Sequence, residues 1–304
     1  MNNGLLVTGA NGFLGSNYIK QCVSDPDNQI IAIWHSKNDC ILKNPPNHIN
    51  YVQCDLTNIN EVKKLFNEWK IKQVLHTAAL IPDNKTDFLT RAALSNITAT
   101  ANLVECAGNH GCERIIYCSS TSVYGPELVD EKGWKENIHI QPNSVYGWSK
   151  FAGEECVRLV CKQAGLIGVS LRLSGIHGPG RKGGVISNMI NAARNNMQIH
   201  VSDAENRFQL LFIDDAVNVI KTVLINQMAG SFHCINVASH IVPSLKHLAE
   251  SIILKLTSDS EIKLDKTISN TEHIMDTSEL FKLPGISFPD FDFRLLQVIN
   301  SLKG

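Results

Sequence analysis

The sequence lacks several features, and each absence excludes a class of protein. Its formal net charge is only -1, and acidic and basic residues are interspersed, so it has no basic excess of the kind that nucleic-acid-binding proteins carry. No apolar stretch is long enough to cross a bilayer, and the first apolar run, Leu5–Thr8, leaves no room for a signal peptide. We therefore expect a cytoplasmic protein with neither a nucleic acid nor a membrane as partner.

The spacing of the nine cysteines indicates neither a disulfide framework nor a metal site. They include no CxxC pair and no metal-ligand spacing, and Cys54 and Cys118 lie inside apolar runs. This distribution is typical of reduced thiols in a reducing compartment. We expect no metal site.

What the sequence does contain is an alternation of apolar runs and helical patterns. With 43% hydrophobic and 19% charged residues, its composition is that of a globular protein. Short apolar runs predict strands at Leu5–Thr8, Ile30–Trp34, Tyr51–Cys54, Gln73–Ala78 and Arg114–Ser119. Helical patterns cover Phe13–Val23, Glu61–Trp69 and Leu89–Ala107. Successive βα units of this kind predict an α/β fold with a doubly wound parallel Rossmann sheet.

The second half is less regular. It predicts a helix over Tyr146–Gln163, a strand over Gly168–Leu173, and a helix over Ile186–Asn195. Further elements are a helix opened by Asp214, the strand Phe232–Val237 and a helix capped by Ser244. We expect a Rossmann domain over residues 1–170. We expect residues 171–304 to form mainly a smaller C-terminal α/β substrate-binding lobe. Some segments of this range are expected to return to the Rossmann core.

Glycines at positions 9, 12 and 15 follow the first strand and precede a helix. Glycines in this context let backbone N–H groups approach a pyrophosphate at a helix N-terminus, although a tight βα turn without a ligand is the alternative. The predicted cofactor-binding residues of this turn are Gly9, Asn11, Gly12, Phe13, Leu14 and Gly15.

The second strand ends in His35, Ser36 and Lys37, without the carboxylate that would bind the ribose hydroxyls of NAD. A hydroxyl and a cation suit the extra phosphate of NADP, so the sequence favours NADP(H), with NAD(H) possible. The alternative for Lys37 is an ordinary solvated loop lysine.

Tyr146 and Lys150 are four residues apart and share one face of the predicted helix. A nearby ammonium stabilises a phenolate and thereby makes a tyrosine useful for acid–base chemistry. The hydroxyl-rich segment Ser119–Ser122 leaves a parallel strand at its carboxyl end, where active sites form in such sheets.

These segments together resemble the extended short-chain dehydrogenases/reductases, more narrowly the nucleotide-sugar epimerases, dehydratases and reductases, over essentially the whole chain. The resemblance implies that Ser120 is the catalytic hydroxyl beside Tyr146 and Lys150. It adds cofactor contacts at Asp55, Leu56, Thr77, Ala78, Ala79, Asn96, Leu173 and Ile176, besides Tyr146 and Lys150. Substrate contacts are expected at Ser119, Thr121, Arg181 and Arg207, although Arg181 and Arg207 are equally interpretable as surface arginines.

Departures from the family pattern decide the expected reaction. Thr121 and Ser122 follow Ser120, where the 4,6-dehydratases carry acidic residues. We therefore expect an NADP(H)-dependent reductase of a nucleotide-linked 4-keto-6-deoxyhexose, with a role in polysaccharide biosynthesis. The alternatives are an NAD(P)-dependent nucleotide-sugar 4-epimerase and a non-catalytic dinucleotide-sensing protein. The resemblance also implies a homodimer formed through the helices at Tyr146–Gln163 and Leu89–Ala107.

Overall fold

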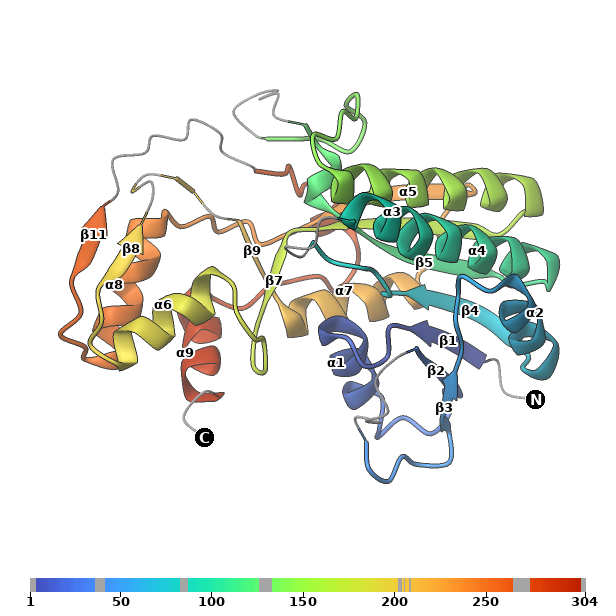
Figure 1. Ribbon diagram of the computed structural model, residues 1–304, viewed down its shortest axis with the longest axis horizontal. Helices are drawn as coiled ribbons and strands as arrows, with labels where there is room; N and C mark the ends of the chain where they lie inside the picture. Colours follow the sequence, from blue (N-terminus) through green and yellow to red (C-terminus); the bar gives the residue numbers. More distant parts are fainter. Residues whose placement is uncertain are drawn as a thin grey trace. The chain divides into compact units, whose positions relative to one another are not determined.

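The computed structural model describes residues 4–35, 42–82, 87–125, 133–201, 204, 206–207, 209–264 and 274–301. Its central sheet has seven strands in the order β10-β6-β5-β4-β1-β2-β3 (Figure 1). Their bounds are β1 (Gly4–Thr8), β2 (Ile30–Trp34), β3 (Ile49–Gln53), β4 (Ile71–His76), β5 (Arg114–Ser120), β6 (Ile167–Leu173) and β10 (Phe232–Val237). β1 pairs in parallel with β2 and β4, β2 with β3, and β4 with β5. The predicted doubly wound Rossmann sheet is confirmed.

The strands are apolar on both faces because helices cover both sides of the sheet, and every residue of β1 is buried. One core lies between the sheet and α2 (Ile59–Glu68), α4 (Ala99–Asn109) and α5 (Val145–Ala164). Figure 1 shows α4 and α5 side by side along this face, with α1 (Phe13–Gln21) on the opposite face. Winding of this kind brings the carboxyl ends of the central strands to one edge of the sheet.

The chain divides into two compact units. The first consists of Met1–Gly125, His139–Arg172 and Val217–Ile235, and the second of Pro126–Ile138, Leu173–Ala216 and Asn236–Gly304. The α7 helix (Ile213–Ile225) contributes residues to both. The assignment of substrate binding to the second unit stays a prediction.

The second unit has its own core, built from α6 (Val185–Arg194), α8 (Leu245–Leu256) and α9 (Phe291–Ser301). Two small parallel sheets, which the sequence did not predict, accompany these helices. They pair β7 (Gly175–His177) with β9 (Leu210–Phe212), and β8 (Ile199–Val201) with β11 (Ile262–Leu264). The buried Arg294 of α9 forms ion pairs with Asp214 and Asp215, and these pairs fix the start of α7 within this unit.

The prediction of one regular helix over Leu89–Ala107 is wrong in its middle. A π-helical segment, η1 (Ala93–Thr98), separates α3 (Phe88–Ala92) from α4. The buried Asn96 of this segment accepts a hydrogen bond from the Leu80 N–H and donates to the Leu80 carbonyl. A π segment adds a residue to the turn and re-aims the side chains around it, and such segments are frequent at functional sites.

Candidate functional site

The glycine turn between β1 and α1 packs closely against the neighbouring strands. Gly9 has φ +66°, and a Cβ there would lie 2.8 Å from the Ala78 nitrogen. A Cβ on Gly15 would collide with the Gly9 carbonyl. Gly12 is the N-cap of α1 and supplies no side-chain cap, an arrangement that suits a phosphate group at the helix N-terminus. The three glycines therefore allow the close packing of this turn, and their contact with a cofactor stays a prediction.

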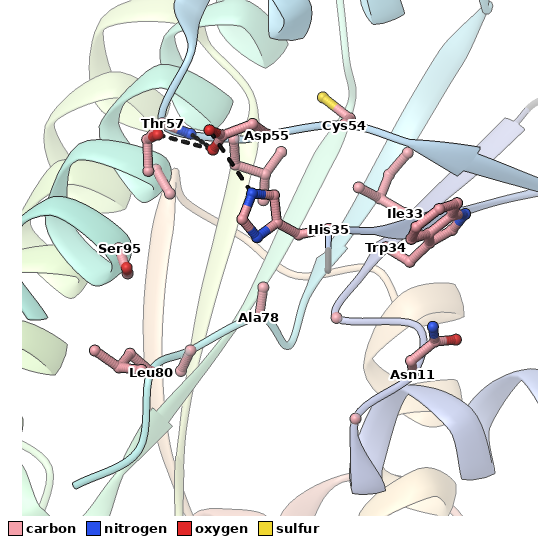
Figure 2. Close-up of a pocket in the computed structure, with 15 residues that line it drawn as sticks. Asn11, Ile33, Trp34, His35, Cys54, Asp55, Thr57, Ala78, Leu80 and Ser95 are labelled. Atoms are coloured by element: carbon pink, nitrogen blue, oxygen red, sulfur yellow. Dashed lines mark hydrogen bonds and ion pairs between the residues drawn. The ribbon is translucent and has the colours of Figure 1, made fainter. Parts of the chain in front are cut away.

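A cavity of about 410 Å³ opens beside this turn. Its walls are the ends of β1, β2, β3 and β4 and part of the η1 and α4 segment. Figure 2 shows its labelled side chains, with Asn11 on the turn before α1 and Ser95 on the opposite side. Glycines without side chains, a few polar groups and a volume of this size fit the adenosine and pyrophosphate of a dinucleotide.

Two oppositely chargeable groups lie at the mouth of the cavity. His35 Nε2 is 3.8 Å from Asp55 Oδ2, and in Figure 2 the imidazole points towards Asp55 while the Trp34 indole points away. Burial acts to raise the pKa of Asp55, but hydrogen bonds from the Thr57 N–H and hydroxyl, together with His35, hold that pKa below its ordinary value. The carboxylate missing at the end of β2 is thus present at the end of β3. Ser36 and Lys37 lie outside the described residues.

The cavity collects many of the predicted cofactor residues, namely Gly9, Asn11, Gly12, His35, Asp55, Leu56, Ala78 and Ala79. Phe13, Leu14, Gly15, Thr77 and Asn96 do not line it. Thr77 instead donates its hydroxyl to the Thr8 carbonyl and so joins β4 to β1. Sequence reasoning missed Ile33, Trp34, Cys54, Thr57, Leu80, Ser95 and Ala99. Most of these flank predicted residues along the same strand ends, which is the signal that would have found them.

The predicted catalytic residues lie on two segments that are in contact, the end of β5 with η2 and the start of α5. Ser120 ends β5 and caps the short 3₁₀ helix η2 (Thr121–Val123), because its Oγ accepts a hydrogen bond from the Ser122 N–H at 3.1 Å. Ser144 caps α5 in the same way by accepting from the Gly147 N–H at 3.0 Å. A Cβ on Gly147 would overlap the Ser122 carbonyl, so the first turn of α5 lies directly against η2. This contact brings the half-buried Tyr146 to the segment that carries Ser120 and Thr121.

Lys150 lies one helical turn further and is only 2% exposed. Burial lowers the pKa of its ammonium to about 8, although the nearby Cys118 and Glu154 act in the opposite direction. The backbone around it is fixed by Asn96, whose amide donates to Ser149 Oγ at 3.0 Å. The Ser149 hydroxyl in turn donates to the Tyr146 carbonyl. In this structure Asn96 therefore ties the π segment to the turn that carries Tyr146 and Lys150.

A buried ion pair under this turn was not predicted. Glu154 accepts hydrogen bonds from the Arg172 guanidinium, with Nη2 and Oε2 2.8 Å apart. Burial acts to lower the pKa of Arg172, but its hydrogen bonds to Glu154 hold that pKa above its ordinary value. Arg172 also donates to the Tyr124 hydroxyl at 2.9 Å. Glu154 follows Lys150 by four residues, so the two share one face of α5. This spacing is the sequence signal that could have predicted where Glu154 lies.

Ser119, a predicted substrate contact, lies beside the same ion pair. It is buried, and its hydroxyl donates to Glu154, so its contact with a substrate stays a prediction. The serine thus links β5 to α5 inside the core. Four other predicted residues lie in the second unit: Leu173 is buried, Ile176 and Arg181 are half-buried, and Arg207 is exposed. Their roles stay predictions.

Comparisons with known proteins identify the family. The profile of the NAD dependent epimerase/dehydratase family matches residues 5–238. The chain belongs to this family. The predicted membership of the extended short-chain dehydrogenases/reductases is thereby confirmed, as is the prediction of an NAD(P)-dependent enzyme of that type.

Individual relatives are spread over several reactions. The chain is 27% identical to an Escherichia coli dTDP-4-dehydro-6-deoxyglucose reductase over 86% of this chain and 84% of that protein. It is 31% identical to the human dTDP-D-glucose 4,6-dehydratase over 85% of this chain and 76% of that protein. Its fold matches that of a Bacillus cereus UDP-glucuronic acid 4-epimerase, solved with UDP-glucuronic acid and NAD, with a TM-score of 0.84 at 20% identity and 99% coverage of both chains.

Two further observations concern the described residues alone. Across them, none of the helices combines the length and apolar character that crossing a membrane requires. In the same part of the chain, no three His, Cys, Asp or Glu side chains gather as a set of metal ligands.

Proposed function

We propose that this family member is an NADP(H)-dependent reductase of a nucleotide-linked 4-keto-6-deoxyhexose. The observation that carries the proposal is the contact between the segment after β5, which carries Ser120, and the first turn of α5, which carries Tyr146, with the buried Lys150 one turn along α5. A protein that only sensed a dinucleotide would not need this acid–base set. The Escherichia coli relative is named as a reductase of such a sugar.

The residues of the candidate site have separate roles in the reduction of a carbonyl. Gly9, Gly12, His35 and Asp55 would hold the dinucleotide, which when bound supplies the hydride to the carbonyl carbon. The Ser120 hydroxyl donates to the carbonyl oxygen and fixes its direction. Tyr146 gives its phenolic proton to that oxygen as negative charge develops on it. The ammonium of Lys150 stabilises the phenolate that remains.

The residues after Ser120 favour reduction over dehydration. Dehydration needs an acid to protonate the leaving hydroxyl, and Thr121 and Ser122 offer only neutral hydroxyl groups. A 4-epimerase remains the second candidate, because Asp55 brings a carboxylate to the cavity and the Bacillus cereus epimerase was solved with NAD. His35 supports NADP(H), since an imidazole N–H at the cavity can donate a hydrogen bond to an additional phosphate.

The deciding experiment follows the oxidation of NADPH, and separately of NADH, with a panel of TDP-, GDP- and CDP-linked 4-keto-6-deoxyhexoses. We expect rapid consumption of NADPH with one of them. Epimerisation of a plain UDP- or GDP-sugar without net cofactor consumption would establish the epimerase instead. Tyr146→Phe is expected to abolish turnover and to leave NADPH binding intact, whereas a pure sensor would lose nothing measurable with this change.

We also propose that the enzyme is a cytoplasmic homodimer that supplies sugars for polysaccharide biosynthesis. All the cysteines in the described ranges are free thiols, which fits a reducing compartment. Large apolar side chains are exposed on the two helices that the resemblance assigns to the dimer, namely Leu89, Leu94, Trp148 and Leu159. Leu159→Glu should yield a monomer in sedimentation velocity, while Leu254→Glu, at another exposed leucine, should not change the sedimentation coefficient.

A further inference from the structure

The side chain of Lys150 has a second neighbour besides the reacting groups. Its Nζ lies over the ring of Tyr117, 4.2 Å from the ring centroid. Tyr117 is 1% exposed, comes from β5, and precedes Ser120 by three residues. The negative face of an aromatic ring attracts a cation, most strongly where both are shielded from water.

The ring of Tyr117 is fixed by the same helical turn that carries Lys150. Its hydroxyl donates to the backbone carbonyl of Lys150 at 3.3 Å. This approach is possible because residue 153 is glycine, and a Cβ at Gly153 would overlap the Tyr117 hydroxyl oxygen. Glycine in a helix interior is unfavourable relative to alanine, so its presence at this contact has a physical reason.

The groups around the Lys150 ammonium indicate that the Tyr117 ring contributes to its stabilisation. From β4 the buried His76 faces the ammonium, from β5 come Tyr117 and Cys118, and from α5 itself come Tyr146 and Glu154. In the described part of the chain no carboxylate lies within ion-pair distance of Lys150 Nζ. An ammonium buried without a paired anion is destabilised, and the face of the Tyr117 ring, 4.2 Å from Nζ, offsets part of that cost.

We propose that Tyr117 is a positioning residue whose ring holds the Lys150 ammonium of α5 in place and in its charged form. The proposal rests on the proposed function, because it assigns a supporting residue to the same catalytic lysine. It makes the electron-rich ring, and not the Tyr117 hydroxyl, the group that matters for the charge of Lys150. The hydroxyl only anchors the ring to the helix.

The test compares two rings of nearly the same shape at position 117. Tyr117→Phe keeps an electron-rich face, whereas 3,4,5-trifluorophenylalanine in place of Tyr117 removes most of its negative potential. The titration of Lys150 is followed by NMR of protein with ¹³Cε-labelled lysine, its signal assigned with Lys150→Met. We expect Tyr117→Phe to titrate close to the natural protein, and the fluorinated protein to titrate about one pH unit lower.

A kinetic readout separates positioning from a merely structural role. The alkaline limb of the pH profile of kcat should move down by the same shift in the fluorinated protein, with little change in KM. Equal titration of Lys150 in both proteins would overturn the proposal. A shifted titration without turnover on any sugar of the panel would retain the role of Tyr117 towards Lys150 and refute the reductase instead, so the two failures are distinguishable.

Discussion

Removing the charge of Glu154 should destabilise the first unit far more than removing the charge of the neighbouring Glu155. Glu154 and Arg172 form an ion pair whose side chains are only 2% and 5% exposed. Glu154→Gln keeps the shape of the side chain but leaves the guanidinium buried without its counter-charge. Breaking a buried pair from one side costs about 3–5 kcal/mol. The total stability of a domain is about 5–15 kcal/mol, so the loss should be large.

Glu155 supplies a matched control one residue away. It pairs with Arg158 at 2.6 Å, but these two side chains are 38% and 40% exposed. Exposed pairs of this kind contribute about 0–1 kcal/mol, so Glu155→Gln should change the stability little. Urea unfolding followed by far-UV circular dichroism measures both variants against the natural chain.

Equal urea midpoints for Glu154→Gln and Glu155→Gln would show that the buried pair contributes no more stability than the exposed one. A further variant checks the assigned cause. Glu154→Leu combined with Arg172→Met removes both charges, and replacing a buried pair by apolar residues is often neutral or stabilising. The double variant should therefore regain much of the stability that Glu154→Gln loses, although the hydroxyls of Ser119 and Tyr124 lose partners in it.

Three further predictions concern the rest of the site. Gly9→Ala should weaken NADPH binding about tenfold or more in a fluorescence titration, whereas Gly111→Ala, at a glycine with a similar positive φ but open space around it, should leave binding unchanged. Ser144→Ala removes the cap that accepts the Gly147 N–H and should lower the free energy of unfolding by about 1 kcal/mol in urea melts. Burial holds the pKa of His76 at about 3 in the folded protein, against 6.5 for an ordinary histidine, so the unfolded chain takes up a proton first as the pH falls. Stability from His76 should be complete above pH 6.5 and decline by about 2 kcal/mol between there and pH 5, a loss that urea melts of His76→Asn should not show.

The parts of the fold that the sequence predicted are those specified by local pattern. The predicted strands Ile30–Trp34 and Phe232–Val237 have those bounds in the structure, because short runs of apolar, β-branched and aromatic residues between turns can be recognised from the sequence alone. The π segment Ala93–Thr98 was beyond such reasoning. Its extra residue is favoured by the hydrogen bonds that Asn96 accepts from the Leu80 N–H and donates to the Ser149 hydroxyl, partners that are distant in sequence.

The same limit applies to the candidate site. The glycine turn and the pairing of Tyr146 with Lys150 are short-range patterns and were predicted. The contacts of Tyr117 with Lys150 and of Glu154 with Arg172 depend on which side of each strand faces α5. A sequence gives the residue types on a strand, but the register against a helix fixes which of them meet.

His76 illustrates how such a register decides chemistry. The Ala78 N–H donates to the Thr8 hydroxyl, which leaves the hydroxyl proton of Thr8 for His76 Nδ1, 2.7 Å away. On the other side the Thr100 hydroxyl donates to the Asn96 carbonyl and so accepts from His76 Nε2 at 2.9 Å. These directions assign a neutral imidazole protonated on Nε2, since a second ring proton would meet the hydroxyl proton of Thr8. Neutrality of His76 is also what the neighbouring ammonium of Lys150 requires, because a charged imidazole would push the lysine towards its uncharged form. Burial therefore keeps His76 neutral within the hydrogen-bond chain that joins β1, β4 and the π segment, and a neutral His76 allows the neighbouring Lys150 to remain charged.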